Sequence, residues 1–107
     1  MITSLVLTPQ EEAFVRALDD LRRASGLGCG RFARALGGIP IDTMKSLLYR
    51  RRRPSPPMVS YLEQRFRADL LRPLKDRDRA LIERIVMAAQ VLLQKSAESS
   101  AFLQNRA

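Results

Sequence analysis

Apolar residues recur every three or four positions along five stretches of this chain of 107 residues, and glycine or proline interrupts the pattern between them. This period matches one face of an α-helix, which makes one turn in about 3.6 residues. The interruptions fall at Gly26, Gly37, Pro54 and Pro73, residue types that end a helix or cannot continue one. The pattern therefore predicts an all-α fold of about five helices.

Capping residues indicate where three of these helices start. Thr8 can cap a helix through its hydroxyl, and Glu11 can complete the capping box. Ser55 can cap a second helix, and Asp76 or Asp78 can cap a third. The predicted helices cover residues 8–25, 29–36, 41–50, 55–71 and 76–96.

Both ends of the chain lack the helical pattern. Residues 1–7 form a β-prone leader, which is compatible with an edge strand that pairs across a dimer and with a segment without regular structure. Residues 97–107 are polar and aperiodic, which predicts a flexible tail. Between these ends we distinguish a domain at residues 8–72 and a C-terminal helix at residues 73–96.

The positive charge is concentrated in the middle third of the chain. The whole sequence has 19 basic and 11 acidic residues, a net charge of +8. Residues 22–53 alone hold nine basic residues against the single acid Asp42, which is also a net +8. A field concentrated in this way suits a polyanion such as DNA, RNA or an acidic membrane surface. The alternative is a basic surface that serves only solubility.

The composition offers little for catalysis or metal binding. The chain has no histidine and a single cysteine, Cys29, so it has neither a disulfide partner nor metal-ligand spacing. No serine or cysteine has an evident base partner. A lone cysteine fits a reducing cytoplasm, and no apolar stretch reaches the length of about 18 residues expected of a membrane span. We therefore expect a cytoplasmic protein that is not an enzyme and has no metal, cofactor or membrane partner.

The most informative combination of residues lies between positions 27 and 55. It consists of Phe32-Ala33, Gly37, Ile39, the helically spaced pair Met44 and Leu47, and the loop Arg51-Arg52-Arg53-Pro54-Ser55. This order resembles the helix-turn-helix of Cro/C1-type (XRE-like) repressors. Those proteins have an apolar residue and alanine on the first helix, glycine at the turn and an apolar anchor after it. Two core positions on the recognition helix and a basic loop ending in proline follow. The resemblance covers residues 8–72.

The chain departs from the family pattern in three places. Gly38 lengthens the turn by one residue, and Gly28 stands where the family usually has a serine or threonine cap. Leu48 and Arg50 replace a common glutamate and glycine at the end of the recognition helix. Either glycine of the turn can adopt the positive φ that the turn requires.

The resemblance implies that residues 41–50 form the recognition helix, whose first residues enter the major groove of DNA. Met44 and Leu47 would then face inward. The outward side chains become candidates for reading bases: Ile41, Asp42, Thr43, Lys45, Ser46 and Tyr49. Asp42 is equally suited to capping this helix, and Ile41 to packing on the helix before it.

Four consecutive arginines follow the predicted recognition helix. Their mutual repulsion is offset if they clamp phosphates or insert one side chain into a narrow minor groove. The alternative is a solvated helix end, where the helix dipole favours cations. Arg31 and Arg34 lie near the start of the preceding helix, where the family places phosphate contacts. The predicted phosphate-binding set is Arg31, Arg34, Arg50, Arg51, Arg52 and Arg53.

The last predicted helix carries a short heptad-like seam with spacings of three, four and three. The residues of the seam are Ile82, Ile85, Ala89 and Leu92. They are candidates for a dimer interface, and the alternative is that they close the core of their own chain. A symmetric dimer would read a palindromic operator with half-sites about one turn of DNA apart.

Together these features predict a homodimeric, sequence-specific DNA-binding transcriptional regulator, a repressor of bacterial or phage type that acts in the cytoplasm on the nucleoid. The first alternative is a module whose main partner is a protein, such as a toxin or RNA polymerase. The second is binding of RNA, or of DNA without sequence preference, through the arginine run.

Overall fold

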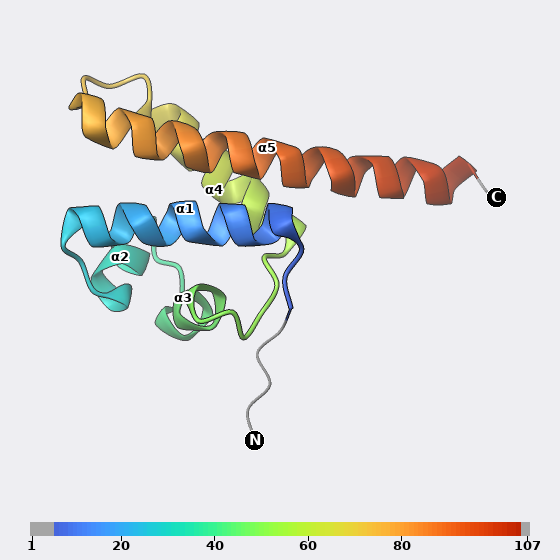
Figure 1. Ribbon diagram of the computed structural model, residues 1–107, viewed down its shortest axis with the longest axis horizontal. Helices are drawn as coiled ribbons and strands as arrows, with labels where there is room; N and C mark the ends of the chain where they lie inside the picture. The colour runs from blue at the N-terminus through green and yellow to red at the C-terminus, as the bar shows by residue number, and fades with distance from the viewer. Residues whose placement is uncertain (1–5, 106–107) are drawn as a thin grey trace.

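The computed structural model describes the backbone of residues 6–105 and the side chains of residues 6–95. Over this part of the chain it contains five helices and no strand, which confirms the predicted all-α fold (Figure 1). The helices are α1 (Pro9–Ser25), α2 (Cys29–Ala35), α3 (Ile41–Leu48), α4 (Pro56–Asp69) and α5 (Asp76–Asn105). Of the predicted leader, positions 1–5 lie outside the described residues, and Val6 and Leu7 have no regular secondary structure.

The helix ends follow from local capping. The Thr8 hydroxyl accepts from the amide of Glu11 at 3.1 Å, and the Glu11 carboxylate accepts from the amide of Thr8 at 2.9 Å. This reciprocal pair is the predicted capping box. Gly26 ends α1 in the left-handed conformation with φ of 70°, and the Ser55 hydroxyl accepts from the amide of Met58 at the start of α4. Because these signals lie within a few residues of each other, sequence alone predicts them well.

One hydrophobic core joins all five helices. The long helix α5 lies against α1 and α4, and α2 and α3 lie on the opposite side of α1 (Figure 1). Fully buried side chains come from four helices: Phe14 and Leu18 on α1, Met44 and Leu47 on α3, Leu62 on α4 and Ile85 on α5. The smaller helix α2 contributes Phe32 and Ala33.

The seam of α5 belongs to this core. Ile82 is 6 % exposed, Ile85 and Ala89 are fully buried, and Leu92 is partly buried. Because α1 and α4 already cover these side chains, the assignment of Ile82, Ile85 and Ala89 to a dimer interface is wrong. The segment after residue 72 closes the core of its own chain, which was the alternative role for the seam.

The last helix is also longer than the sequence pattern predicted. It continues to Asn105, so the expected flexible tail is helical up to that residue, and residues 106–107 lie outside the described part. No glycine or proline interrupts residues 76–105, and polarity alone does not end a helix. At about 1.5 Å per residue the helix is roughly 45 Å long, and its C-terminal end projects past the other helices (Figure 1). Within the described residues no helix is long and apolar enough to cross a membrane.

Candidate nucleic-acid interface

Two glycines make the turn between α2 and α3. Gly37 has φ of 102° and Gly38 has φ of 85°, so both residues, and not one of the two, adopt the left-handed region. The amides of Gly38 and Ile39 donate to the same carbonyl of Ala33, at 3.3 and 3.2 Å. The longer turn thus needs two residues with positive φ in succession. Glycine adopts this conformation at less cost than any other residue type.

Side chains of α4 hold this turn from outside. The hydroxyl of Tyr61 donates to the carbonyl of Leu36 at 2.6 Å, and Arg65 donates to the carbonyl of Ala35 at 3.1 Å. A Cβ added at Gly37 would collide with the Tyr61 hydroxyl. Gly37 is therefore required both by its conformation and by the close approach of Tyr61.

The helix α3 presents one face to the core and the opposite face to solvent. Met44 and Leu47 are fully buried, as predicted. Asp42, Lys45 and Tyr49 are exposed, and their spacing of three and four residues aligns them along one face of the helix. Thr43 and Ser46 are only half-exposed, so they border this face.

The sequence left open whether Asp42 caps α3 and whether Ile41 packs on α2, and the structure answers the two questions differently. The N-cap residue is Pro40, and the described helix start has no side-chain cap, so Asp42 in the first turn does not cap the helix. Ile41 is 45 % exposed, and its Cδ1 lies 3.0 Å from the position that a Cβ would take at Gly30. Ile41 therefore packs on α2 and still presents part of its side chain to solvent.

Arg50 is tied to its own chain. Its backbone is left-handed with φ of 59°, at the position where the resembled family commonly has glycine. Its Nε and Nη2 donate to the two carboxylate oxygens of Glu12 at 3.2 and 2.6 Å, and its Nη1 donates to the carbonyl of Leu48 at 2.6 Å. The hydrogen bond from Arg50 holds the pKa of Glu12 below its ordinary value, and the same bond raises the pKa of Arg50.

Arg53 is held in a similar way by Glu11, the residue before Glu12 on α1. Its Nη1 donates to the Glu11 carboxylate at 2.6 Å and its Nη2 to the carbonyl of Val6 at 3.1 Å. Arg50 and Arg53, both in the predicted phosphate-binding set, are thus paired with carboxylates of α1, and the Arg53 side chain is still 52 % exposed. Arg51 and Arg52 are exposed, and the guanidinium of Arg51 lies 5.8 Å from the centroid of the Tyr49 ring, a cation–π contact.

Acids on α1 therefore divide the basic middle third into two groups. Arg22 and Arg23 pair with Asp19 at 2.9 and 3.0 Å, and Arg50 and Arg53 pair with Glu12 and Glu11. The other five basic side chains of residues 22–53 have no carboxylate within ion-pair distance among the residues that the structure describes. These unpaired cations are Arg31, Arg34, Lys45, Arg51 and Arg52.

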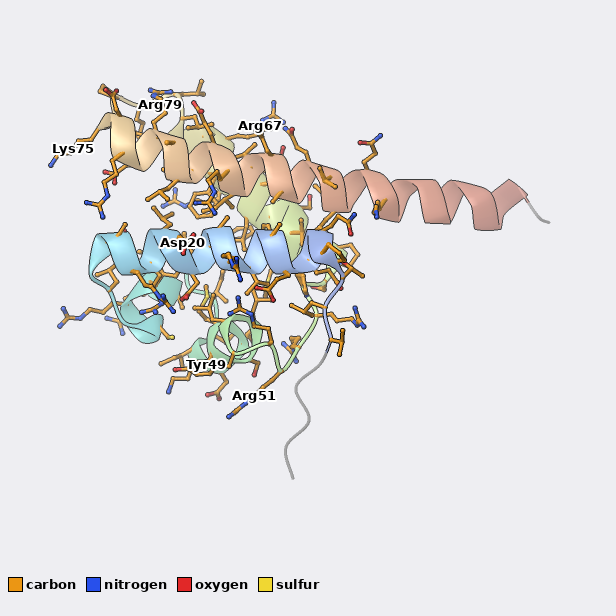
Figure 2. The ribbon with its side chains drawn as sticks, viewed as in Figure 1. Asp20, Tyr49, Arg51, Arg67, Lys75 and Arg79 are labelled. Carbon is orange, nitrogen blue, oxygen red and sulfur yellow. The ribbon has the colours of Figure 1, made fainter. Side chains whose placement is uncertain are left out.

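The unpaired cations all come from α2, α3 and the loop that follows α3. These elements lie on the side of α1 that faces away from α5 (Figure 1), and Figure 2 shows Tyr49 and Arg51 on this side. Arg31 and Arg34 border an open hollow between α2 and the start of α3, which Gly38 and Ile41 also line. We call this surface, with its five cations and the exposed face of α3, the α2–α3 face.

The unpaired cations of the α2–α3 face have the chemistry needed to bind anions. Guanidinium and ammonium groups donate hydrogen bonds to phosphate oxygens, and Arg does so in a two-pronged geometry. Cys29, the first residue of α2, is half-buried, and no group of three or more His, Cys, Asp or Glu side chains within the described residues could hold a metal ion.

Comparison of the chain with protein-family models, with curated proteins and with solved structures finds no match.

Proposed function

We propose that this protein is a sequence-specific DNA-binding transcriptional regulator that reads duplex DNA with α3, in the manner of a Cro/C1-type helix-turn-helix. One observation carries the proposal: the five basic side chains of the middle third that lack a carboxylate partner among the described residues all come from α2, α3 and the loop after α3, on the side of α1 that faces away from α5 (Figure 1). Duplex DNA is a dense line of negative charge, and binding through such cations releases condensed counterions.

The exposed face of α3 supplies the residues for base recognition. The major groove is about 12 Å wide and admits one helix. Lys45 can donate to the acceptors of guanine, Asp42 can accept from the cytosine amino group, and the exposed part of Ile41 can contact a thymine methyl. Arg31 and Arg34 on α2, and Arg51 and Arg52 after α3, are the proposed phosphate contacts on either side of this helix.

Selection from a random duplex pool at near-physiological salt tests this proposal. We expect a defined motif, and we expect Arg31→Gln/Arg34→Gln to bind more weakly than wild type with a shallower salt dependence. The matched control is Lys75→Gln/Arg77→Gln, which removes two exposed cations at the start of α5, the helix on the other side of α1 (Figure 1); Figure 2 labels Lys75. Loss of binding in both variants to the same extent, or no motif from wild type, would contradict the proposal.

The proposal includes a homodimer on a palindromic operator, with repression by occlusion of the promoter. Since the seam of α5 is buried, a second copy must contact other residues. Met87 is 67 % and Val91 is 44 % exposed, and Val91 borders an apolar hollow together with Pro9 and Ala13 of α1. A protein partner such as a toxin or polymerase would use the same apolar patch, and a monomeric state of the isolated protein would favour that alternative.

Two ion pairs lie beside this patch, where Glu12, Arg16 and Arg84 line a hollow together with Met87. Arg84 pairs with Asp20 at 3.2 Å and Arg16 pairs with Glu12 at 3.9 Å. Because these charges are already paired within one chain, the support for a second copy at the patch is the exposed apolar area of Met87 and Val91.

A further inference from the structure

The four consecutive arginines differ in what they contact: the outer two, Arg50 and Arg53, pair with acids of α1, and the inner two have no carboxylate partner among the described residues. We propose that Arg50 and Glu12 are a positioning pair that holds the recognition helix on α1, and that only Arg51 and Arg52 of the run bind phosphates. This inference rests on the proposed function, because phosphate contacts presuppose DNA binding. The part that concerns the positioning pair can be tested without DNA.

The Arg50 guanidinium connects the end of α3 with the start of α1. Nη1 donates to the Leu48 carbonyl in the last turn of α3, while Nε and Nη2 donate to the Glu12 carboxylate near the start of α1. All three bonds come from one planar group, so they fix the end of α3 in both distance and orientation. The side chain of Arg50 is 28 % exposed, which leaves little of it for a ligand.

The two acids that pair with the arginines are also stabilised by their position at the start of α1. Glu11 and Glu12 lie in the first turn of α1, where the helix dipole favours carboxylates. One oxygen of Glu11 accepts from both the Thr8 amide and Arg53 Nη1, and the Glu11 side chain is only 13 % exposed. The capping box of α1 thus presents a fixed carboxylate to Arg53, next to the one that holds Arg50.

Pairing at both ends of the run leaves the two middle arginines without a partner. Arg51, Arg52 and Arg53 are all exposed, but only Arg51 and Arg52 have no carboxylate within ion-pair distance among the described residues. The like charges of Arg50 and Arg53 are neutralised at short range, so the field that a phosphate meets at this loop comes mainly from two cations. Counting the run as four phosphate contacts would overstate the salt dependence of binding.

The salt dependence measures this count directly, because each phosphate contact adds about 0.9 to the slope of log affinity against log salt concentration. The experiment compares Arg51→Gln/Arg52→Gln with Arg50→Gln/Arg53→Gln. Both variants remove two positive charges from the same four residues, so their difference reports position and not net charge. The probe is a short mixed-sequence duplex, titrated between about 50 and 200 mM salt at a temperature where circular dichroism shows both variants folded.

We expect the slope of Arg51→Gln/Arg52→Gln to be smaller than that of wild type by about 2, and the slope of Arg50→Gln/Arg53→Gln to equal that of wild type. Equal loss of slope in both variants would overturn the division of the run, and so would an unchanged slope in both. For Arg50→Gln alone we expect the ratio of affinity for the selected motif to affinity for the mixed duplex to fall at unchanged slope, because α3 is less well oriented. A structural role without positioning would leave this ratio as in wild type.

A thermodynamic cycle without DNA tests the positioning pair by itself. Glu12→Gln, Arg50→Gln and the double variant are compared by denaturant unfolding, and we expect the effect of the double variant to be smaller than the sum of the single effects. Additive effects would overturn the pair. If wild type binds no duplex at all while the cycle shows coupling, the proposed function and the phosphate contacts fail together, and the Arg50–Glu12 pair stands as a contact of the fold.

Discussion

The hydroxyl of Tyr61 on α4 donates a hydrogen bond of 2.6 Å to the carbonyl of Leu36, at the point where the chain leaves α2 for the turn. This bond places the phenol directly over Gly37, where the hydroxyl occupies the space of a Cβ. The angle at which α3 leaves α2 therefore depends on a residue of α4, and a change at this contact would be felt at the exposed face of α3.

Alanine substitutions at Gly37 and Gly38 separate the cost of a positive φ from the cost of a steric contact with Tyr61. Both glycines have positive φ, so Gly37→Ala and Gly38→Ala each cost about 1 kcal/mol or more in free energy of unfolding. Gly37→Ala costs more, because its Cβ also meets Tyr61, whereas the added Cβ at Gly38 has no heavy atom within 4 Å. Denaturant unfolding measures both values. In a Tyr61→Phe background the excess cost of Gly37→Ala shrinks, and an undiminished excess would contradict the contact.

Features of the fold that depend on residues close in sequence could be predicted, whereas contacts between residues far apart in sequence could not. The Thr8–Glu11 box, the Ser55 cap and the burial of Met44 and Leu47 follow from local spacing, and they are as predicted. The heptad seam of α5 is ambiguous in sequence, because apolar spacing is the same whether a helix faces its own chain or a second copy. Only the packing of α1 and α4 shows that Ile85 is buried in the monomer.

In the candidate site, too, local features could be predicted from the sequence and long-range contacts could not. Exposure of Asp42, Lys45 and Tyr49 follows from helical periodicity once Met44 faces inward. The pairing of Arg50 with Glu12 spans 38 positions and that of Arg53 with Glu11 spans 42, and no local pattern predicts such pairs. One signal was present: Arg50 stands where the resembled family commonly has glycine, and a non-glycine residue in the left-handed region needs compensating contacts.

The Arg50–Glu12 pair makes stability depend on pH in a defined direction. Hydrogen bonding from Arg50 lowers the pKa of Glu12 in the folded state, so the folded protein binds this proton less readily than the unfolded chain does. The stabilisation is therefore complete above the unfolded pKa of about 4.3 and is lost as the pH falls through the lower folded value. Because the Glu12 side chain is 35 % exposed, solvent screening limits the effect to about 1 kcal/mol or less.

Melting temperatures of wild type, Glu12→Gln and Arg50→Gln between pH 7 and about pH 3 check this dependence. We expect both variants to be less stable than wild type at pH 7 and the difference to narrow below the unfolded pKa. A difference that stays constant across this range would show that Glu12 does not carry the effect. Arg50 adds no second transition in this range, because its pKa is raised further above the ordinary value for arginine.

Exposed residues of α5 test the homodimer. Met87→Glu/Val91→Glu places two charges on the apolar patch, and we expect it to convert a dimer into a monomer with little change in the fold, because both side chains are exposed. Molar mass from light scattering measures the change. The matched core variant Ile85→Ala should instead lower the free energy of unfolding by about 2–5 kcal/mol, since Ile85 is fully buried. A wild-type protein that is monomeric at high concentration would contradict the dimer.

The exposed face of α3 gives the most direct test of base recognition. Lys45 and Tyr49 are exposed and do not belong to the hydrophobic core, so alanine at either position should change the free energy of unfolding by no more than about 0.5 kcal/mol. If Lys45 donates to guanine, Lys45→Ala should cost about 1–3 kcal/mol in affinity for the selected motif and relax the preference at one base position. Repeating the selection with Lys45→Ala and Lys45→Arg measures this directly. A phosphate-binding Lys45 predicts the opposite pattern, in which every sequence is bound more weakly, the motif is unchanged, and the salt slope falls by about 1.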